Sequence, residues 1–195
     1  MIRMNAPRNG VADALEIVSG EILALLARVQ ETSDGALTIL VDRTESAHRV
    51  FVHGAGRSGL ALRMVAMRLM HLGLTVHVVG EATAPAVGEG DLVILASGSG
   101  TTPGIVRAGE TATRAGASVA TLTTDVDSPL AALSAVTVVV PAAHKTDRSA
   151  TASRQYAGSL FEQGVLLVGD ALFHALWQRS GRTADELWPR HANIE

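Results

Sequence analysis

Short apolar runs alternate with helical patterns from residue 49 onward, and this alternation constrains the fold more than any other feature of the chain. The runs have the length of strands, and most are followed by apolar residues at helical spacing. Repeated βα units predict a doubly wound α/β fold, a five-stranded parallel sheet with helices on both faces. We expect strands at residues 49–53, 74–79, 91–96, 118–123 and 136–140, and helices at residues 58–71, 103–115, 128–133, 156–179 and 184–187.

Two amphipathic helices are predicted before the first strand, at residues 11–29 and 33–47. We interpret residues 1–48 as a helical arm and residues 1–195 as one domain, because no repeat or low-complexity linker marks a boundary. The arm has no helical hairpin partner large enough to cover its apolar stripe. It must therefore pack on the sheet or on another subunit, and we expect an oligomer.

Composition excludes several classes of function. The chain has no cysteine, which excludes disulfides, thiol catalysis and thiolate-bound zinc. A formal charge of −3 and 3% aromatic residues are atypical of a nucleic-acid binder. Asn5, Arg8 and Asp13 interrupt any signal peptide, and no apolar run approaches the length of a membrane span. The histidines show no metal-binding spacing. We expect a cytoplasmic protein that binds no metal, membrane or nucleic acid.

Residues 97–102 (SGSGTT) form a loop suited to a phosphate group. They follow an apolar strand and precede a helix that begins near Pro103. Glycines let backbone N–H groups converge, hydroxyl groups add donors, and the helix N-terminus presents unpaired N–H groups. The alternative is an ordinary strand-to-helix turn with a Ser/Thr N-cap.

A second loop, residues 54–59 (GAGRSG), follows the first strand with the G-x-G-x-x-G spacing of dinucleotide-binding folds. Glu81 lies about 20 residues further on, as that fingerprint requires. A nucleotide-dependent oxidoreductase is therefore one hypothesis, although no part of the chain remains for a substrate domain. In a doubly wound sheet, ligands bind where the strand order reverses. If the first and third strands flank that point, both loops face one crevice and a single phosphate-bearing ligand can use both.

The two loops together resemble those of the sugar isomerase (SIS) domain family, whose members bind phosphosugars in such a crevice. Within that family, the resemblance runs from about residue 49 to the C-terminus and is to the 6-phospho-3-hexuloisomerases. Thr101 stands where many relatives carry glutamate. The residues that carry the narrower resemblance are 67–73 (MRLMHLG), 80–85 (GEATAP), 158–163 (GSLFEQ) and 190–195 (RHANIE).

The resemblance implies interconversion of D-arabino-hex-3-ulose 6-phosphate and fructose 6-phosphate, in the ribulose monophosphate route of formaldehyde fixation. It implies no cofactor and a homotetramer. The alternatives are another phosphosugar isomerase and a non-catalytic phosphosugar sensor. Such sensors are usually joined to a DNA-reading domain, for which residues 1–48 are short and acidic.

This interconversion requires a proton to be removed from one carbon and returned to its neighbour. Glu162 is the candidate base for both steps. On the predicted helix it shares a stripe with apolar residues such as Val165 and Phe173, and an apolar setting favours the protonated form of a carboxyl group. The alternative is a solvated glutamate near a helix N-terminus. His191 lies in a short tail after Pro189, so it reaches a site only by docking. We place it in an active site, of a neighbouring subunit, as a general acid or base; the alternative is a frayed terminus.

The phosphate contacts are expected from hydroxyl groups and backbone amides of the two loops. Arg57 and Lys145 are further candidates, and the alternatives are a surface arginine at a helix start and a solvated lysine. The predicted phosphate- and substrate-binding residues are Gly56, Arg57, Ser58, Ser97, Ser99, Thr101 and Thr102.

Overall fold

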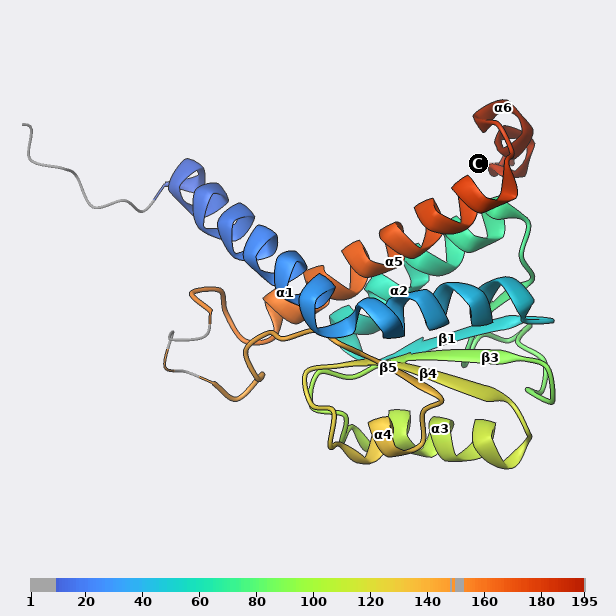
Figure 1. Cartoon of the computed structure of the whole chain (residues 1–195), viewed down its shortest axis with the longest axis horizontal. Coiled ribbons are helices and arrows are strands. Elements are labelled where there is room, and N and C mark those ends of the chain that lie inside the picture. The colour runs from blue at the N-terminus through green and yellow to red at the C-terminus, as the bar shows by residue number, and fades with distance from the viewer. Residues whose placement is uncertain (1–9, 148, 150–152, 195) are drawn as a thin grey trace, which may run out of the picture.

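A five-stranded parallel sheet forms the centre of the computed structural model, which describes residues 10–147, 149 and 153–194 (Figure 1). The strand order is β2-β1-β3-β4-β5, so the order reverses between β1 and β3, the arrangement that lets both loops face one crevice. Residues 1–9 of the predicted arm, with Asn5 and Arg8, lie outside the described residues. The strands are β1 (Val50–Gly54), β2 (Val76–Val78), β3 (Leu92–Ala96), β4 (Ser118–Thr123) and β5 (Val136–Val139).

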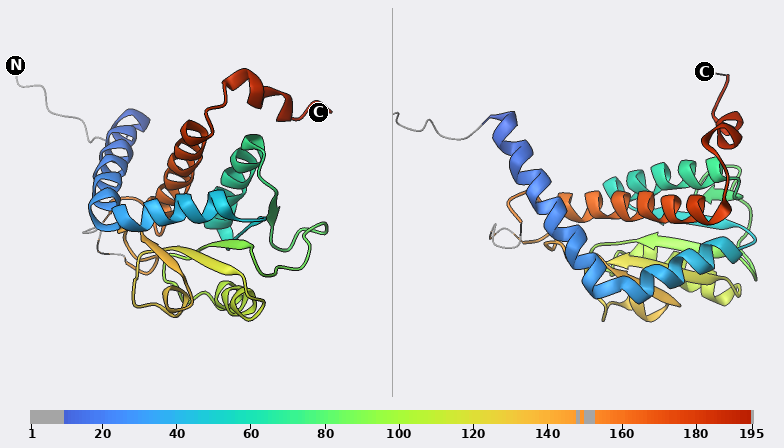
Figure 2. Two further views of the ribbon diagram at one scale, coloured as in Figure 1. Left: turned by 45° about the vertical axis from the view of Figure 1, so that its right-hand side comes forward. Right: turned by 45° about the horizontal axis from the view of Figure 1, so that its top comes forward.

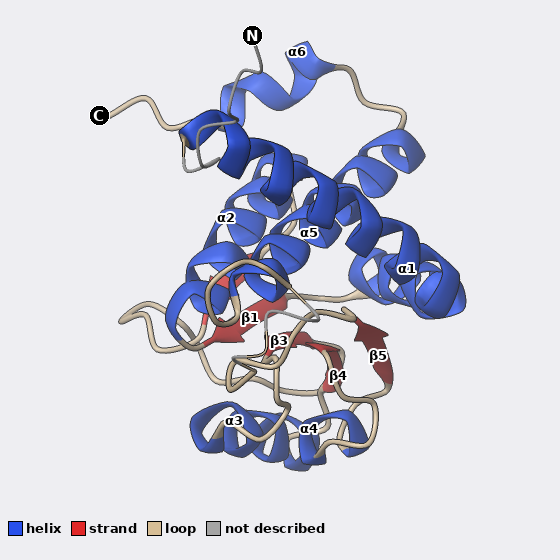
Figure 3. Cartoon of the chain, turned by 90° about the vertical axis from the view of Figure 1, so that its left-hand side faces the viewer, coloured by secondary structure: helices blue, strands red, loops and turns tan. Residues whose placement is uncertain are grey.

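Helices cover both faces of the sheet, which confirms the predicted doubly wound fold. Figure 3 shows α1, α2 and α5 on one face and α3 and α4 on the other. Within the described ranges, no helix is long and apolar enough to cross a membrane. The helices are α1 (Val11–Ser46), α2 (Gly56–Leu72), α3 (Pro103–Arg114), α4 (Pro129–Ala132), α5 (Ser159–Ser180) and α6 (Ala184–Leu187), followed by a 3₁₀ turn (Trp188–Arg190).

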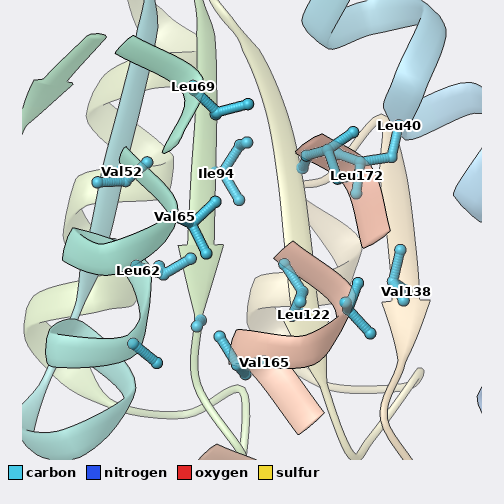
Figure 4. Close-up of a cluster of buried hydrophobic side chains, with 14 of the residues drawn as sticks. Leu40, Val52, Leu62, Val65, Leu69, Ile94, Leu122, Val138, Val165 and Leu172 are labelled. Atoms are coloured by element: carbon cyan, nitrogen blue, oxygen red, sulfur yellow. The ribbon is translucent and has the colours of Figure 1, made fainter. Parts of the chain in front are cut away.

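The larger hydrophobic core lies between the sheet and the α1, α2 and α5 layer. Figure 4 shows Val65 of α2 and Val165 of α5 beside Ile94 and Leu122 of the central strands. All four side chains are at most 2% exposed. Burying each such side chain contributes about 1.5–3 kcal/mol, so this layer fixes the position of α5 against the sheet.

The arm differs from the prediction of two helices. It is one continuous helix, α1, whose two halves lie at an angle to one another (Figure 2). No proline separates the halves, and a single glycine, Gly35, does not end a helix. Near the bend, the Ser33 hydroxyl donates to the Val139 carbonyl and accepts the Val139 N–H at the end of β5. The second half packs on the sheet, and the first half extends beyond it with Leu15 and Leu23 exposed.

Candidate active site

A cavity of about 460 Å³ opens at the carboxyl ends of β1 and β3, where the strand order reverses. The two loops predicted to bind phosphate form one side of it. The segment after β5 and the start of α5 form the other side. The lining residues are 55–58, 96–99, 102, 143–145, 156–159, 161 and 162.

The loop after β1 is tightly closed, and its glycines have local structural reasons. A Cβ atom on Gly59 would lie 2.3 Å from the Gly54 carbonyl oxygen, and one on Gly54 would lie 2.9 Å from the Gly59 nitrogen. Gly56 has a φ of +57° and begins α2. The first N–H groups of α2 have no acceptor within the helix and lie beside the cavity with Arg57 and Ser58. The turn itself therefore requires glycine at these positions, whether or not a dinucleotide binds.

Glu81 does not support the dinucleotide hypothesis. Its carboxylate forms an ion pair with Arg63 of α2, and it is not among the residues that line the cavity. An acidic residue that binds a ribose would have to face the glycine loop. The fingerprint match is therefore explained by the strand-to-helix turn.

The loop after β3 directs its polar groups toward the cavity. The Gly98 carbonyl accepts the N–H of Thr124 at 3.0 Å and its hydroxyl at 2.8 Å, which fixes the loop to the end of β4. Within the part of the chain that the structure describes, the N–H groups of Gly98 and Ser99 have no protein acceptor. The buried Ser97 hydroxyl lies 2.9 Å from the Thr102 hydroxyl. Converging donors of this kind suit an anion.

The structure does not support the alternative that this loop is an ordinary strand-to-helix turn with a Ser/Thr N-cap. Thr102 occupies the N-cap position of α3, but its side chain makes no capping hydrogen bond. Thr101 is exposed and not among the cavity-lining residues, although its hydroxyl donates to Ser99 Oγ at 2.8 Å. Thr101 is therefore placed beside the cavity rather than in its wall, in contrast to the prediction.

Glu162 faces the cavity from the first turn of α5. The sequence predicts that this helix begins at residue 156, but it begins at Ser159. Ala157 has a φ of +52°, which lies outside the region of a right-handed α-helix. The Glu162 side chain is 20% exposed, and its Oε2 lies 2.5 Å from Nε of Arg57. The environment of Glu162 is therefore apolar only in part. The guanidinium group of Arg57, from the loop that faces it, balances the charge of the carboxylate. The cavity brings a carboxylate and a cation to the edge of the two loops.

His191 lies far from the cavity of its own chain. Its ring stacks on His71 with the centroids 4.0 Å apart, and it lies 4.6 Å from the ring of Trp188. His71 is at the last turn of α2, roughly 22 Å along the helix from Gly56. Burial, together with the nearby His191 and Arg68, lowers the pKa of His71. His191 therefore lies outside the cavity of its own chain.

Several cavity residues were not singled out from the sequence. His144, Tyr156 and Phe161 line the cavity beside the predicted Lys145. His144 belongs to a polar stretch without periodicity, and the sequence predicts Tyr156 only as the first residue of a helix, so no pattern indicates either as a cavity residue. Phe161 could have been found, because it adjoins Glu162 in the GSLFEQ motif.

A phosphate site in this cavity predicts that Ser97→Ala and Ser99→Ala weaken binding of phosphorylated ligands. Each loss should be about 1–3 kcal/mol if the hydroxyl is a donor to a charged group. Titration calorimetry with inorganic phosphate and with fructose 6-phosphate measures it. Ser46→Ala is the control, because the exposed Ser46 lies outside the cavity and its hydroxyl donates to carbonyls of α1. Unchanged affinity with lower stability would instead identify a purely structural turn.

Comparison with known proteins places this geometry in a family. The SIS domain model matches residues 45–166. A 3-hexulose-6-phosphate isomerase from Mycobacterium gastri is 51% identical over 185 residues, which cover 95% of this chain and 92% of that protein. One from Bacillus subtilis is 38% identical and covers 80% of this chain and 85% of its own length.

A solved structure shows the same architecture. It is that of a Methanococcus jannaschii protein for which a molecular function of 3-hexulose-6-phosphate isomerase was inferred. It is 30% identical to this chain, has a TM-score of 0.80, and the match covers 94% of this chain and 99% of that one. The chain belongs to the SIS domain family and, within it, to the family of the 3-hexulose-6-phosphate isomerases.

Proposed function

We propose that this chain interconverts D-arabino-hex-3-ulose 6-phosphate and fructose 6-phosphate, in the ribulose monophosphate route of formaldehyde fixation. The observation that carries the proposal is one cavity in which two donor-rich loops face a carboxylate, in a chain 51% identical to a 3-hexulose-6-phosphate isomerase. The reaction moves hydrogen within one molecule and changes no net oxidation state. It therefore needs no redox cofactor.

The chemistry transfers a proton between neighbouring carbons. Moving the carbonyl group from C3 to C2 requires removal of the proton on C2, an enediol, and return of a proton to C3. Glu162 is the proposed base, and one carboxylate that reaches both carbons can perform both transfers. The Arg57 guanidinium, beside Glu162 and the N-terminus of α2, is placed to offset the negative charge that develops on the enediol oxygens.

The phosphate is proposed to bind between the start of α2 and the loop after β3. Ser58, Ser97, Ser99 and Thr102 would donate hydroxyl groups, and Gly56 and Gly98 would expose backbone N–H groups. The N-terminal end of α2 adds the favourable field of the helix dipole. Lys145, on the opposite wall, is a further cation for the sugar phosphate.

We further propose that residues 1–195 act as a single domain that assembles as a homotetramer, with the arm used in assembly. Two observations support assembly. The first half of α1 exposes Leu15 and Leu23, and α2 exposes Leu60, Met64 and Met67. Exposed apolar stripes of this kind are typical of subunit interfaces. Assembly would also allow His191 to reach the cavity of a neighbour.

Comparing the forward and reverse rates of a His191→Ala variant tests the role of His191. A ketone at C3 of a 6-phosphorylated hexose cannot form a five- or six-membered ring, because O6 is esterified and O5 would close a four-membered ring. Fructose 6-phosphate does cyclise, through O5 onto C2, so only the reverse reaction begins with ring opening. If His191 opens the ring, His191→Ala retains the forward rate, and its reverse rate stops rising as more enzyme is added. Reverse rates proportional to enzyme, with both directions slowed alike, would place His191 in proton transfer.

A coupled assay with hex-3-ulose 6-phosphate tests the proposed reaction directly. A thermal-shift series separates the alternatives, because ligands that bind only the folded state raise its stability. Fructose 6-phosphate should stabilise the protein and NAD(H) should not. Stabilisation by the sugar phosphate without turnover would identify a phosphosugar sensor. Stabilisation by NAD(H) alone would identify a nucleotide-dependent enzyme.

A further inference from the structure

The first half of α1 contacts the chain segment that leads into the cavity wall. Glu21 lies on this half, one turn before the buried Leu25, and its carboxylate accepts three hydrogen bonds. Ser153 Oγ donates at 2.7 Å, the backbone N–H of Arg154 at 2.7 Å, and Nε2 of Gln155 at 3.1 Å. One side chain of the arm thus binds three consecutive residues that follow it by more than 130 positions.

The environment of Glu21 favours the ionised carboxylate that these bonds require. Burial raises its pKa, but hydrogen bonds from Arg154, Ser153 and Gln155 and the charge of Arg154 bring the pKa below its ordinary value. Ser153 is 8% exposed, and its hydroxyl also accepts the Gln155 N–H at 3.0 Å. Removing the carboxylate would leave the hydroxyl of the buried Ser153 without this acceptor, which is costly.

The next residues form a wall of the cavity and continue into α5. Ala157 has a φ of +52°, a conformation that persists only where neighbouring contacts hold the backbone. The Ser159 N–H and hydroxyl both donate to the Tyr156 carbonyl, at 3.3 and 2.9 Å. The Glu162 N–H donates to the Gly158 carbonyl at 3.1 Å. A displacement at residue 155 would therefore pass directly to the turn that carries Glu162.

Helix α1 also holds the chain where it leaves β5. Arg28, two turns after Glu21, donates to the Pro141 carbonyl, shortly before the cavity residues His144 and Lys145. Figure 2 shows the start of α5 and the segment after β5 beside α1. The arm thus contacts both parts of the chain that face the two glycine loops across the cavity.

We propose that Glu21 is a positioning residue of the isomerase. Its carboxylate fixes residues 153–155 and so sets the place of the wall at residues 156–159, and of Glu162, relative to the loops at residues 54–59 and 97–102. The arm then has a role in each chain's own site in addition to assembly. This inference rests on the proposed function, because the positioned group is the proposed base.

Steady-state kinetics of Glu21→Ala provide the first test. A displaced wall should lower kcat/KM by roughly 10- to 100-fold, since small misplacements of reacting groups are costly. Glu21→Gln, which retains one acceptor oxygen, should recover part of the loss. Glu31→Ala, an exposed glutamate on the same helix, is the matched control and should retain wild-type kinetics. In a double-mutant cycle, the loss of kcat/KM in the Glu21→Ala/Ser153→Ala double variant should be smaller than the product of the fold-losses in the two single variants.

Hydrogen exchange distinguishes positioning from a local or global structural role. The proposal predicts faster exchange in Glu21→Ala at the Arg154, Ser159 and Glu162 amides, with unchanged exchange in β3 and β4. Faster exchange at Arg154 alone with wild-type kinetics would overturn it, as would faster exchange throughout the core. If the wild type binds fructose 6-phosphate without isomerising it, the proposed function fails. The exchange pattern and the affinity of Glu21→Ala for that ligand then decide the positioning role separately.

Discussion

Glu162→Gln should lower the turnover of the isomerisation by roughly two to four powers of ten, with little change in sugar-phosphate affinity. Glutamine keeps the shape of the side chain but cannot accept the C2 proton. The ion pair with Arg57 is lost as well, but Arg57 is 63% exposed, so this loss should affect stability little. The coupled assay measures turnover, and calorimetry with fructose 6-phosphate measures affinity.

The matched control for this variant is Asp170→Asn, which removes an exposed carboxylate from the same helix outside the cavity. It should turn over at the wild-type rate. Thermal unfolding of both variants checks that the fold is intact. Wild-type turnover in Glu162→Gln would remove this residue from the mechanism. A loss of affinity equal to the loss of rate would make it a binding group instead.

Gly59→Ala should lower the free energy of unfolding by about 3–5 kcal/mol, or prevent folding. Its Cβ atom would lie 2.3 Å from the Gly54 carbonyl oxygen and 2.9 Å from the carbonyl carbon. Both atoms belong to the backbone of β1, an inner strand of the sheet, so no side-chain rotation relieves the contact. Denaturant unfolding measures the effect, and sugar-phosphate binding should weaken with it because the loop lines the cavity.

Gly20→Ala is the opposite control, because a Cβ atom there has no neighbour within 4 Å and the residue lies inside α1. Alanine should stabilise this position by about 0.5–1 kcal/mol through the unfolded state and helix propensity. Equal stability of Gly59→Ala and the wild type would show that the β1–α2 turn tolerates a side chain. The glycine spacing would then need another explanation, such as close approach of a ligand.

The sheet was predictable because its information is local. The strand predicted at residues 118–123 coincides with β4, and the ends of the other four strands differ from the prediction by at most two residues. The strands β3 and β4 are buried on both faces, so they read as nearly continuous apolar runs. General rules for parallel sheets place the ligand where the strand order reverses, and the structure shows that this point lies between β1 and β3. The two helices predicted for the arm were wrong, since a local polar interval such as residues 30–32 does not end a helix.

The site was predictable only in part. The loops at residues 54–59 and 97–102 are recognisable from contiguous stretches of small residues. The resemblance of the GSLFEQ motif indicated Glu162. No local pattern could indicate that Arg57 faces Glu162, because these residues meet only after α2 and α5 pack together.

By itself, the sequence determined the doubly wound sheet, the two donor-rich loops and their shared edge, because periodicity and turn composition act within a few neighbouring residues. Only the tertiary structure decided that α1 is continuous, that Glu21 binds residues 153–155, and that His191 lies at the opposite end of α2 from the cavity. The physical reason is that such contacts join residues more than 100 positions apart. They form between surfaces that exist only after the helices have packed on the sheet.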